Sequence, residues 1–499
     1  MEYYLTFDVG TTAMKCVLFD ENFSKAAFVS KEYSLLTPSP DFVEIEAQTY
    51  WDTFVSCVKE IGLQKDLSQI SAITFTTQGE TLIPVDEQNH ALHNAVVWID
   101  ARAEKQAEKI RSLIPLKDFY ARTGLSCING ALPLAKLMWF ASERPDVYAK
   151  TDKFLLLEDY LIARLTGHRV SEKSLLSSTG WFDIIREEYL SDLLNACGID
   201  ESKLPEILPC GSKVASVNAV SANETGLPMS AVVTTGAMDQ VSSAVGAGNV
   251  RPGIVTETTG TALVIGATAE KADPDNPEML TIYKHFNHGF LYMPFCNTAG
   301  IVLKWFKDNF LEDLSLRAKE ENRSVYALVD EFAEQSPVGS RGVILLPHFA
   351  GKGVPGEIDG ATGVLFGLTL ATKKEDVTRA VLEGVGYMLC EVLTALEKCG
   401  VPVNEVRSLG GGSYSTLWSR IKADICGKTF FRMKEAESTS LGAAILGFTA
   451  LHPECTVEET AEKCVALSSS TSPNEENRPL YAESFRKYLS LYAALKNEF

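Results

Sequence analysis

Two short segments, far apart in the chain, share the same order of strand, threonine- and glycine-containing turn, and strand. The first runs from the apolar residues 3–7 through Asp8-Val9-Gly10-Thr11-Thr12 to the apolar residues 16–19. The other runs from residues 254–256 through Thr258-Thr259-Gly260-Thr261 to residues 262–265. Each pattern is typical of a β-hairpin, and its recurrence predicts a chain built of two similar halves.

The segments between and after these hairpins predict an α/β fold. Apolar residues recur at helical spacing over residues 47–61 and 377–396, and residues 70–75 read as a strand. Gly384 and Gly386 interrupt the later helix, which suggests close packing there. Helices and strands alternate in both halves, so layered α/β units are expected. We place the N-terminal domain at residues 1–248 and the C-terminal domain at residues 249–499.

Charge and composition exclude several classes of partner. The 499 residues carry a formal net charge of −19, which disfavours nucleic acids and anionic membrane surfaces. We find no signal peptide and no apolar run long enough to span a bilayer. Eleven cysteines are scattered without a Cys-x-x-Cys pair, which fits a reducing compartment. We therefore expect a cytoplasmic protein with no nucleic-acid or membrane partner.

The first turn has the residues needed to hold a phosphate group. Gly10 allows the backbone to approach closely, and Thr11 and Thr12 add hydroxyl donors. Asp8, at the end of a strand, could hold Mg²⁺ through water, and Lys15 would lie across the hairpin. The alternative is an ordinary turn that uses Asp and Gly for conformational reasons.

Two further glycine-containing segments extend this hypothesis. Thr259, Gly260 and Thr261 offer the same chemistry in the second hairpin, so a phosphate chain could be held from both sides. Gly410, Gly411, Gly412 and Ser413 follow a strand-like segment and precede a helix expected over residues 415–426. A run of glycines exposes flat backbone on which an adenosine could lie. No Gly-Lys-Ser/Thr follows, so this run is not a P-loop.

Asp239 is the candidate catalytic base. It follows a strand predicted over residues 232–235, at a position where α/β sheets bind ligands. Phosphoryl transfer to a hydroxyl needs a carboxylate that orients the acceptor and takes its proton. The alternative is an aspartate that caps the following helix, and one residue could do both. We also expect Asp239 to share the metal with Asp8, and Asp239 and Gln240 to contact the acceptor.

Polar residues beside a tryptophan form a candidate acceptor site in the first half. Gln78 and Glu80 follow one apolar run, and Trp98, Asp100 and Arg102 follow another. A polyol needs many directional hydrogen bonds, which such side chains supply. The alternative is simple loop polarity with a packed tryptophan and a surface Asp–Arg pair.

Together these residues resemble the FGGY family of carbohydrate kinases. The segment 363–368, followed after seven residues by the segment 376–383, fits the C-terminal signature of that family at every defined position. The N-terminal signature fits only in part: Pro133, Lys136, Leu137, Trp139 and Phe140 agree with it, and Ala131 and Ser142 do not. The resemblance extends from Asp8 to Ala444.

The resemblance implies two ribonuclease-H-like domains, as in the actin and hexokinase ATPases, with a cleft between them. It implies ATP and Mg²⁺ as cofactors, a sugar-binding N-terminal domain and a nucleotide-binding C-terminal domain. Asp239 would be the catalytic base. The nucleotide positions would be Asp8, Gly10, Thr11, Thr12, Lys15, Thr259, Gly260, Thr261, Gly410, Gly411, Gly412 and Ser413. The sugar positions would be Gln78, Glu80, Trp98, Asp100 and Arg102.

Two departures from the family pattern concern the acceptor. Met238 stands where the family often has glycine before the catalytic aspartate. Gly79 stands where xylulokinases commonly have methionine and glycerol kinases have arginine. We expect a ketose such as xylulose as the acceptor, with glycerol, a tetritol or gluconate as alternatives.

Other functional classes fit the sequence less well. A nucleotide-gated binding module, like actin or the heat-shock ATPases, would share the phosphate turns but has no use for a sugar site. A nicotinamide dehydrogenase would need a dinucleotide turn after the first strand, which residues 8–12 do not supply. Homodimers are a reasonable prior for the oligomeric state.

Overall fold

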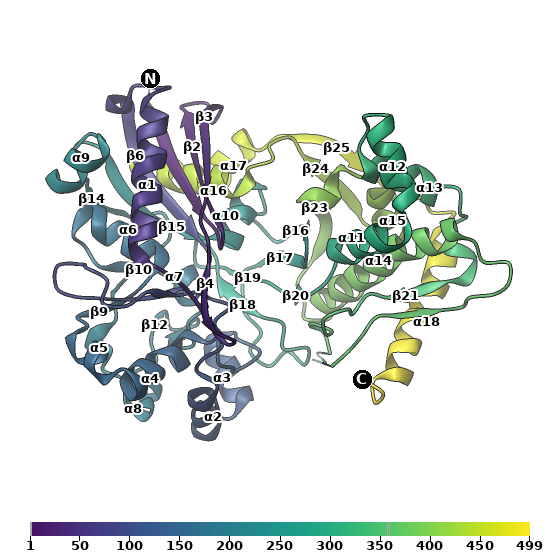
Figure 1. Ribbon diagram of the computed structural model, residues 1–499, viewed down its shortest axis with the longest axis horizontal. Helices are drawn as coiled ribbons and strands as arrows, with labels where there is room; N and C mark the ends of the chain where they lie inside the picture. The colour runs from purple at the N-terminus through teal and green to yellow at the C-terminus, as the bar shows by residue number, and fades with distance from the viewer. Residues whose placement is uncertain (1, 357, 359) are drawn as a thin grey trace.

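The computed structural model describes residues 2–356, 358 and 360–499, and it contains two α/β halves joined side by side (Figure 1). The central sheet of the first half has the strand order β14-β15-β6-β1-β2-β3. Strand β1 pairs antiparallel with β2 and parallel with β6, and β15 continues the parallel part. These strands are β1 (Tyr3–Val9), β2 (Ala13–Asp20), β3 (Lys25–Glu32), β6 (Ile70–Thr77), β14 (Lys213–Ser216) and β15 (Val232–Met238).

The central sheet of the second half repeats this arrangement. Its order is β18-β19-β17-β16-β23-β24-β25, with β16 antiparallel to β17 and parallel to β23. The strands are β16 (Gly253–Thr259), β17 (Leu263–Ala269), β18 (Ile282–Lys284), β19 (Phe290–Tyr292), β20 (Phe295–Cys296), β23 (Val403–Leu409), β24 (Thr429–Met433) and β25 (Leu467–Thr471). Strand β24 continues the parallel part, and β25 closes it antiparallel, as β15 and β14 do in the first half. The two hairpins recognised in the sequence are therefore β1–β2 and β16–β17.

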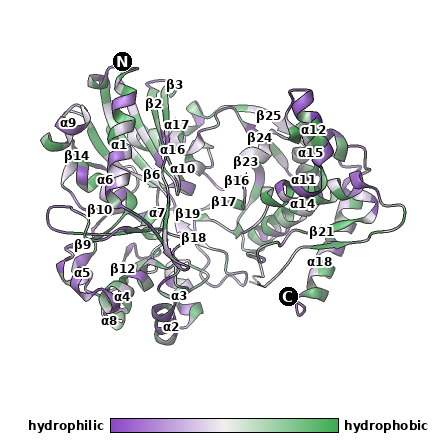
Figure 2. Cartoon of the chain, in the orientation of Figure 1, coloured by the Kyte–Doolittle hydropathy of each residue, from purple (hydrophilic) through white to green (hydrophobic). Residues whose placement is uncertain are grey.

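Burial on both faces explains why the strands are so apolar. Six of the seven residues of β1 are buried, and so are six of the seven residues of β16. Figure 2 shows apolar and polar residues mixed along these strands. In the first half, α1 (Ala47–Gly62) and α6 (Leu157–Thr166) cover the sheet, and α9 (Ala219–Thr225) lies outside α1. The apolar residues predicted over 47–61 form the buried face of α1.

The first half also contains a smaller sheet and a group of helices below the central sheet. The small sheet has the order β4-β5-β8-β7-β9. Its strands are β4 (Leu36–Ser39), β5 (Phe42–Ile45), β7 (Leu82–Val85), β8 (Ala95–Val96) and β9 (Lys153–Leu156). The helices are α2 (Glu104–Leu113), α3 (Leu116–Thr123), α4 (Pro133–Glu143), α5 (Pro145–Lys150), α7 (Lys173–Leu176) and α8 (Ser191–Cys197). Two short strand pairs complete it: β10 (Val170–Glu172) with β13 (Glu206–Leu208), and β11 (Phe182–Asp183) with β12 (Glu188–Tyr189).

The predicted glycine-containing helix is α14 (Lys374–Lys398), at the centre of the second half. A Cβ on Gly384 would lie 2.7 Å from the carbonyl oxygen of Leu345, and one on Gly386 would lie 2.7 Å from Cδ1 of Ile425. The predicted close packing is therefore confirmed. The other elements here are α11 (Gly300–Phe310), α12 (Glu312–Glu320), α13 (Val325–Ala333), α15 (Thr416–Cys426), α18 (Arg478–Leu495), β21 (Ile344–Leu346) and β22 (Val364–Phe366).

The chain returns to the first half after completing most of the second. Helix α16 (Ser438–Leu451) packs against β1 and β6, and also against α10 (Asp239–Gly246). In Figure 1, α16 and α17 (Val457–Cys464), from near the C-terminal end of the chain, lie beside the N-terminal strands. The domain boundary at residues 248 and 249 stays a prediction. The return of the chain shows that α16, which follows this boundary in sequence, packs on the first half.

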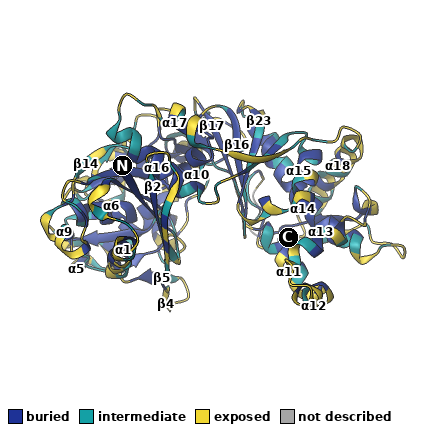
Figure 3. Cartoon of the chain, turned by 90° about the horizontal axis from the view of Figure 1, so that it is seen from above, coloured by how far each residue is buried: buried dark blue, intermediate teal, exposed yellow. Residues whose placement is uncertain are grey.

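The buried strands and the exposed outer helices follow from this layering. Seen from above, the sheets are mostly buried, and the outermost helices such as α9 and α12 carry exposed residues (Figure 3). Within the described residues, no helix combines the length and the apolar character needed to cross a bilayer.

Candidate active site

The first glycine turn closes the β1–β2 hairpin. The Gly10 amide donates to the carbonyl of Ala13 at 3.0 Å, and Asp8 lies opposite Lys15 in the ladder. The Tyr33 hydroxyl donates to the carbonyl of Gly10 at 2.5 Å and so fixes the turn from outside. Lys15 forms an ion pair with Glu437 at 2.8 Å, at the start of α16.

A chain of hydrogen bonds connects this turn to the candidate acceptor residues. The Thr11 hydroxyl donates to Oε1 of Gln78 at 2.7 Å and accepts from Nε1 of Trp98 at 2.9 Å. The amide nitrogen of Gln78 donates to the hydroxyl of Thr81 at 3.1 Å. The structure therefore brings Thr11, Gln78 and Trp98 together, although 87 residues separate the first from the last.

The second turn is backed by a buried ion pair. Lys422, on α15, lies 2.9 Å from Glu257 and also donates to the Thr259 hydroxyl at 2.7 Å. Thr259 in turn donates to Glu257 at 2.6 Å. The side chains of Lys422 and Glu257 are 2 % and 0 % exposed. The Thr259 hydroxyl is thus fully engaged inside the protein, so any phosphate contact at this turn falls to its backbone and to Thr261.

The glycine run packs directly on the second turn. A Cβ on Gly412 would lie 2.8 Å from Cβ of Thr259, and one on Gly410 would lie 3.2 Å from the Thr259 carbonyl oxygen. Gly410 has φ +70°, a conformation that favours glycine. The Ser413 hydroxyl donates to the Gly410 carbonyl at 2.7 Å and closes the turn before α15. The expected helix at 415–426 begins at Thr416, with Ser415 as its N-cap.

Asp239 is the first residue of α10, so Met238 rather than Asp239 occupies the cap position. One carboxylate oxygen of Asp239 accepts from the Gln240 amide at 2.7 Å. Burial, and then the charge of Asp8, raise the pKa of Asp239 to about 7. Burial also raises the pKa of Asp8 to about 6, although Lys15 opposes the shift. The two predicted metal-binding carboxylates are therefore close enough to repel each other.

Glu80 faces Asp239 and a buried lysine. Burial raises the pKa of Glu80, Lys136 lowers it, and the charge of Asp239 raises it again. The Lys136 ammonium donates to the carbonyls of Val97 at 2.9 Å and Trp98 at 3.3 Å, and it is 0 % exposed. It therefore holds the segment that carries Trp98 against α4.

Asp100 and Arg102 are engaged with each other. Arg102 bonds both carboxylate oxygens of Asp100, at 2.8 and 2.6 Å, and pairs with Glu44 at 2.7 Å. The Arg102 guanidinium lies 3.9 Å from the ring centre of Phe42 and 4.8 Å from that of Trp139. The alternative of a surface Asp–Arg pair is wrong, because the two side chains are 0 % and 1 % exposed. They form a buried network behind Trp98, which is 39 % exposed.

Three site residues were not assigned a role from the sequence. Lys136 entered only as a signature position, and Lys422 lies in a helix whose charge pattern is ordinary. Tyr283 comes from β18 of the second half. Burial, and the charges of Glu80 and Asp239 among others, raise the pKa of its hydroxyl, so it lies near the acceptor residues of the first half. Only tertiary packing could reveal these partners.

Residues 270–293 form an arm from the second half that docks on the first. The Ile282 amide donates to the Gly124 carbonyl at 2.9 Å, and the Lys284 amide donates to the Ser177 hydroxyl at 3.0 Å. The Lys284 ammonium pairs with Glu187 at 2.8 Å. Tyr283, between these two anchors, is thereby fixed beside the first half.

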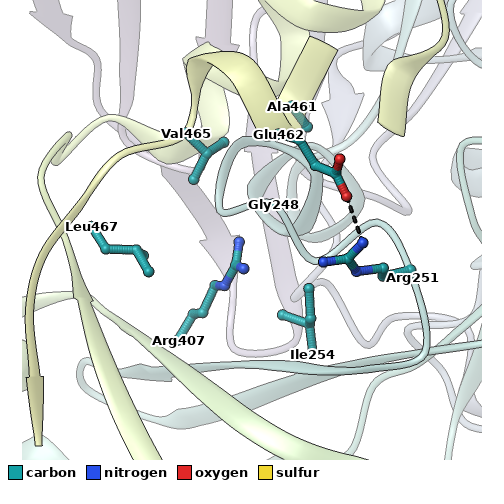
Figure 4. A pocket seen from close by; sticks show the side chains of 8 residues that line it. All are labelled: Gly248, Arg251, Ile254, Arg407, Ala461, Glu462, Val465 and Leu467. Atoms are coloured by element: carbon teal, nitrogen blue, oxygen red, sulfur yellow. Dashed lines mark hydrogen bonds and ion pairs between the residues drawn. The ribbon is translucent and has the colours of Figure 1, made fainter. Parts of the chain in front are cut away.

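A separate cavity of about 110 Å³ lies where the chain crosses between the halves (Figure 4). Its lining combines Gly248 and Arg251 from the linker after α10 with Arg407 from β23 and Glu462 from α17. Arg251 pairs with Glu462 at 2.6 Å, and Arg407 donates to the Ala247 carbonyl at 2.5 Å. None of the predicted site residues lines this cavity, so it is separate from the candidate active site.

Family models match most of the chain. The N-terminal domain model of the FGGY family of carbohydrate kinases matches residues 3–246, and its C-terminal domain model matches residues 254–451. The chain belongs to the FGGY family of carbohydrate kinases. This FGGY kinase is therefore a phosphotransferase with an alcohol group as acceptor, and ATP and a small sugar are its expected substrates.

Individual relatives cover the whole chain of this FGGY kinase. It is 29% identical to a gluconokinase of Bacillus licheniformis, over 100% of this chain and 97% of that protein. It is 26% identical to a xylulose kinase of Staphylococcus xylosus, over 99% and 100% of the two chains. The crystal structure of ligand-bound xylulose kinase from Lactobacillus acidophilus has a TM-score of 0.91 at 24% identity, with 99% of each chain covered. The predicted fold of two ribonuclease-H-like domains is confirmed.

Proposed function

We propose that this FGGY kinase uses MgATP to phosphorylate a primary hydroxyl of a small neutral sugar or polyol, with a ketose such as xylulose as the leading acceptor. The observation that carries the proposal is Asp239. Asp239 is the first residue of α10. Its carboxylate lies near Asp8 of the first phosphate turn and has a pKa raised to about 7. A group with such a pKa is suited to accept a proton at neutral pH.

The step follows from this placement. The acceptor oxygen forms a bond to the γ-phosphorus as the bond from that phosphorus to the bridging oxygen of ADP breaks. The acceptor proton passes to Asp239, and the products are ADP and a phosphate ester. The two turns hold the phosphate chain through backbone N–H groups, so most of the rate comes from positioning and electrostatics. Tyr283 and Trp98 would help to exclude water.

Asp8 and Asp239 suit Mg²⁺ as the accompanying ion. The charge of Asp8 raises the pKa of Asp239, a bound cation relieves this repulsion, and Mg²⁺ prefers oxygen ligands. Within the described residues, no group of three or more acidic, histidine or cysteine side chains is arranged as a metal cage. This agrees with an ion that keeps several waters and binds through phosphate oxygens. When bound, the ion would neutralise charge on the phosphates.

The charge of the acceptor site favours a neutral acceptor. Glu80, Asp239 and Asp8 supply three carboxyl groups, and the Lys136 ammonium beside Glu80 donates to two backbone carbonyls. An aldonate carboxylate would meet repulsion there. Gluconate is the second candidate, because a gluconokinase is among the relatives at 29% identity. Initial rates of ADP release with xylulose, glycerol, erythritol and gluconate, each with MgATP, separate the two.

Asp239→Asn tests the proposed base. It should lower kcat by roughly 100- to 10,000-fold, because the proton acceptor is lost. Nucleotide affinity, measured by calorimetry, should stay within about threefold, because a neutral amide removes the repulsion with Asp8 without adding bulk. Turnover close to that of the parent enzyme would remove Asp239 from the role. If the parent enzyme releases no ADP with any of these acceptors, the proposed function itself is overturned.

A further inference from the structure

Position 79 leaves little room for a side chain. A Cβ on Gly79 would lie 3.0 Å from the Ser178 hydroxyl oxygen and 3.3 Å from the sulfur of Met238. Both distances are tighter than most real Cβ contacts. The Met238 side chain is therefore directly against the Gly79 backbone, and the two departures from the family pattern are in contact with each other.

Neighbouring contacts hold both obstacles in place. The Met238 amide donates to the Ser174 hydroxyl at 3.0 Å, and the Ser178 hydroxyl donates to the Leu175 carbonyl at 2.8 Å. Met238 is 3 % exposed and belongs to an apolar core that extends into the second half. Moving the Ser178 hydroxyl would break its hydrogen bond, and moving the Met238 side chain would disturb the packing of that core.

Each member of this contact is adjacent to an acceptor-facing carboxylate. Glu80 follows Gly79, and Asp239 follows Met238. Glu80 has φ +65°, a left-handed conformation that is rare for a residue with a side chain and that is found at functional sites. The Gly79–Met238 contact therefore sets how far apart the backbones that carry Glu80 and Asp239 lie.

We propose that Met238 takes the space that a side chain at position 79 would fill, and that this contact determines which acceptors fit between Glu80 and Asp239. The inference rests on the proposed function and deepens it. The wall made by the thioether is apolar and uncharged, so it suits the carbon face of a neutral acceptor and offers no cation for a carboxylate. A side chain at 79 and the methionine at 238 exclude each other.

A double-mutant cycle tests the proposal. Gly79→Met should lower kcat/KM for the best neutral acceptor by about 100-fold, and Met238→Gly by about tenfold. The double variant should recover at least about tenfold over Gly79→Met, because the inserted side chain then enters the vacated space. Met238→Gly alone should raise the use of an acceptor one carbon longer relative to the best one. The KM for ATP should stay within about twofold in every variant.

Gly79→Ala and Met238→Ala form a milder second cycle, which serves if Gly79→Met does not fold. Lys105→Ala, at an exposed residue of α2, is the control for handling and stability. The proposal is overturned if either cycle is additive, or if Gly79→Met retains the parent kcat/KM. If the parent enzyme is inactive with every acceptor tested, the proposed function is overturned as well. If the parent is active and the effects of the two substitutions add, only this inference is overturned.

Discussion

The ionisation of Asp239 gives the reaction a predicted pH dependence. Its pKa is raised to about 7, and only the deprotonated carboxylate can accept the acceptor proton. The value of kcat/KM should therefore fall as the pH drops below about 7, and level off above it. Rates of ADP release from roughly pH 5.5 to pH 9, at limiting acceptor, measure this limb. A flat profile would contradict the assignment.

Glu80 supplies the control for that experiment, because its pKa is raised as well. Glu80→Gln should weaken acceptor binding and raise KM, but it should keep the acidic limb. Loss of the limb in Glu80→Gln, with Asp239 intact, would transfer the proton-accepting role to Glu80. The pH profiles thus distinguish the two carboxylates. Loss of the proton acceptor changes the shape of the profile, whereas loss of an acceptor-binding group changes only its height.

The buried Lys422–Glu257 pair gives a prediction about stability. Lys422→Met leaves Glu257 charged and unpaired, which costs about 3–5 kcal/mol when a buried pair is broken. The melting temperature should therefore fall, and the KM for ATP should rise because Thr259 and its turn lose their support. Adding Glu257→Gln should restore part of the stability. Lys319→Met, at an exposed lysine of α12, is the matched control and should change neither quantity.

At the scale of elements, α10 and α16 pack closely because each has a glycine, Gly246 or Gly442, at the point of contact. A Cβ on Gly246 would lie 1.8 Å from the Ser438 carbonyl oxygen, and one on Gly442 would lie 1.8 Å from that of Ser242. Gly442→Ala must push the helices apart, at a cost of about 1–3 kcal/mol or more. Because α10 begins with Asp239, kcat should fall together with the melting temperature. Ser243→Ala, on the same helix, should leave both close to those of the parent.

The same elements show which parts of the fold the sequence could predict. The β1–β2 and β16–β17 hairpins and α14 follow from local patterns, so their positions were predictable. Helix α16 is a run of small and apolar residues, and this pattern does not indicate which sheet the helix covers. Its place on β1 and β6 is decided by contacts with residues more than 300 positions earlier in the chain.

The candidate site divides in a similar way. The positions of Gly10 and Gly412 in turns and of Asp239 at a strand end were predictable from the sequence, and their roles stay predictions. The engagement of Thr259 with Lys422 was not predictable, nor was the burial of Arg102 against Phe42. Such pairings depend on side chains that come together from distant segments, so they cannot be predicted from the spacing of residues in the sequence.

At the scale of the whole molecule, the docked arm and the chain crossings between the halves constrain how the halves can move. The arm at residues 270–293 is bonded to the first half, so it should move with that half when the cleft closes. The chain crosses between the halves at residues 247–252, 434–437 and 465–466, and the first and last of these crossings lie at the cavity in Figure 4. Arg407 donates to the Ala247 carbonyl at the end of α10. Closure should therefore rotate the second half about these crossings.

Hydrogen exchange measured by mass spectrometry can locate that rotation. Asp239→Asn is suited to it, because it should bind MgATP and acceptor together without turning them over. Exchange should slow at the three crossings and at residues 410–413 when both ligands are present, since closure restricts the crossings and covers the glycine run. Exchange at residues 280–284 should stay unchanged, because the hydrogen bonds of Ile282 and Lys284 persist in both states.

Either ligand alone is the control, and it should produce only part of the slowing, because each half then lacks one of its contacts. Faster exchange at residues 280–284 in the ternary complex would show that the arm releases. Tyr283 would then leave the acceptor site as the cleft closes, and the acceptor pocket would belong to the first half alone. Unchanged exchange there, with slowing at the crossings, means that both halves build the pocket before any ligand arrives.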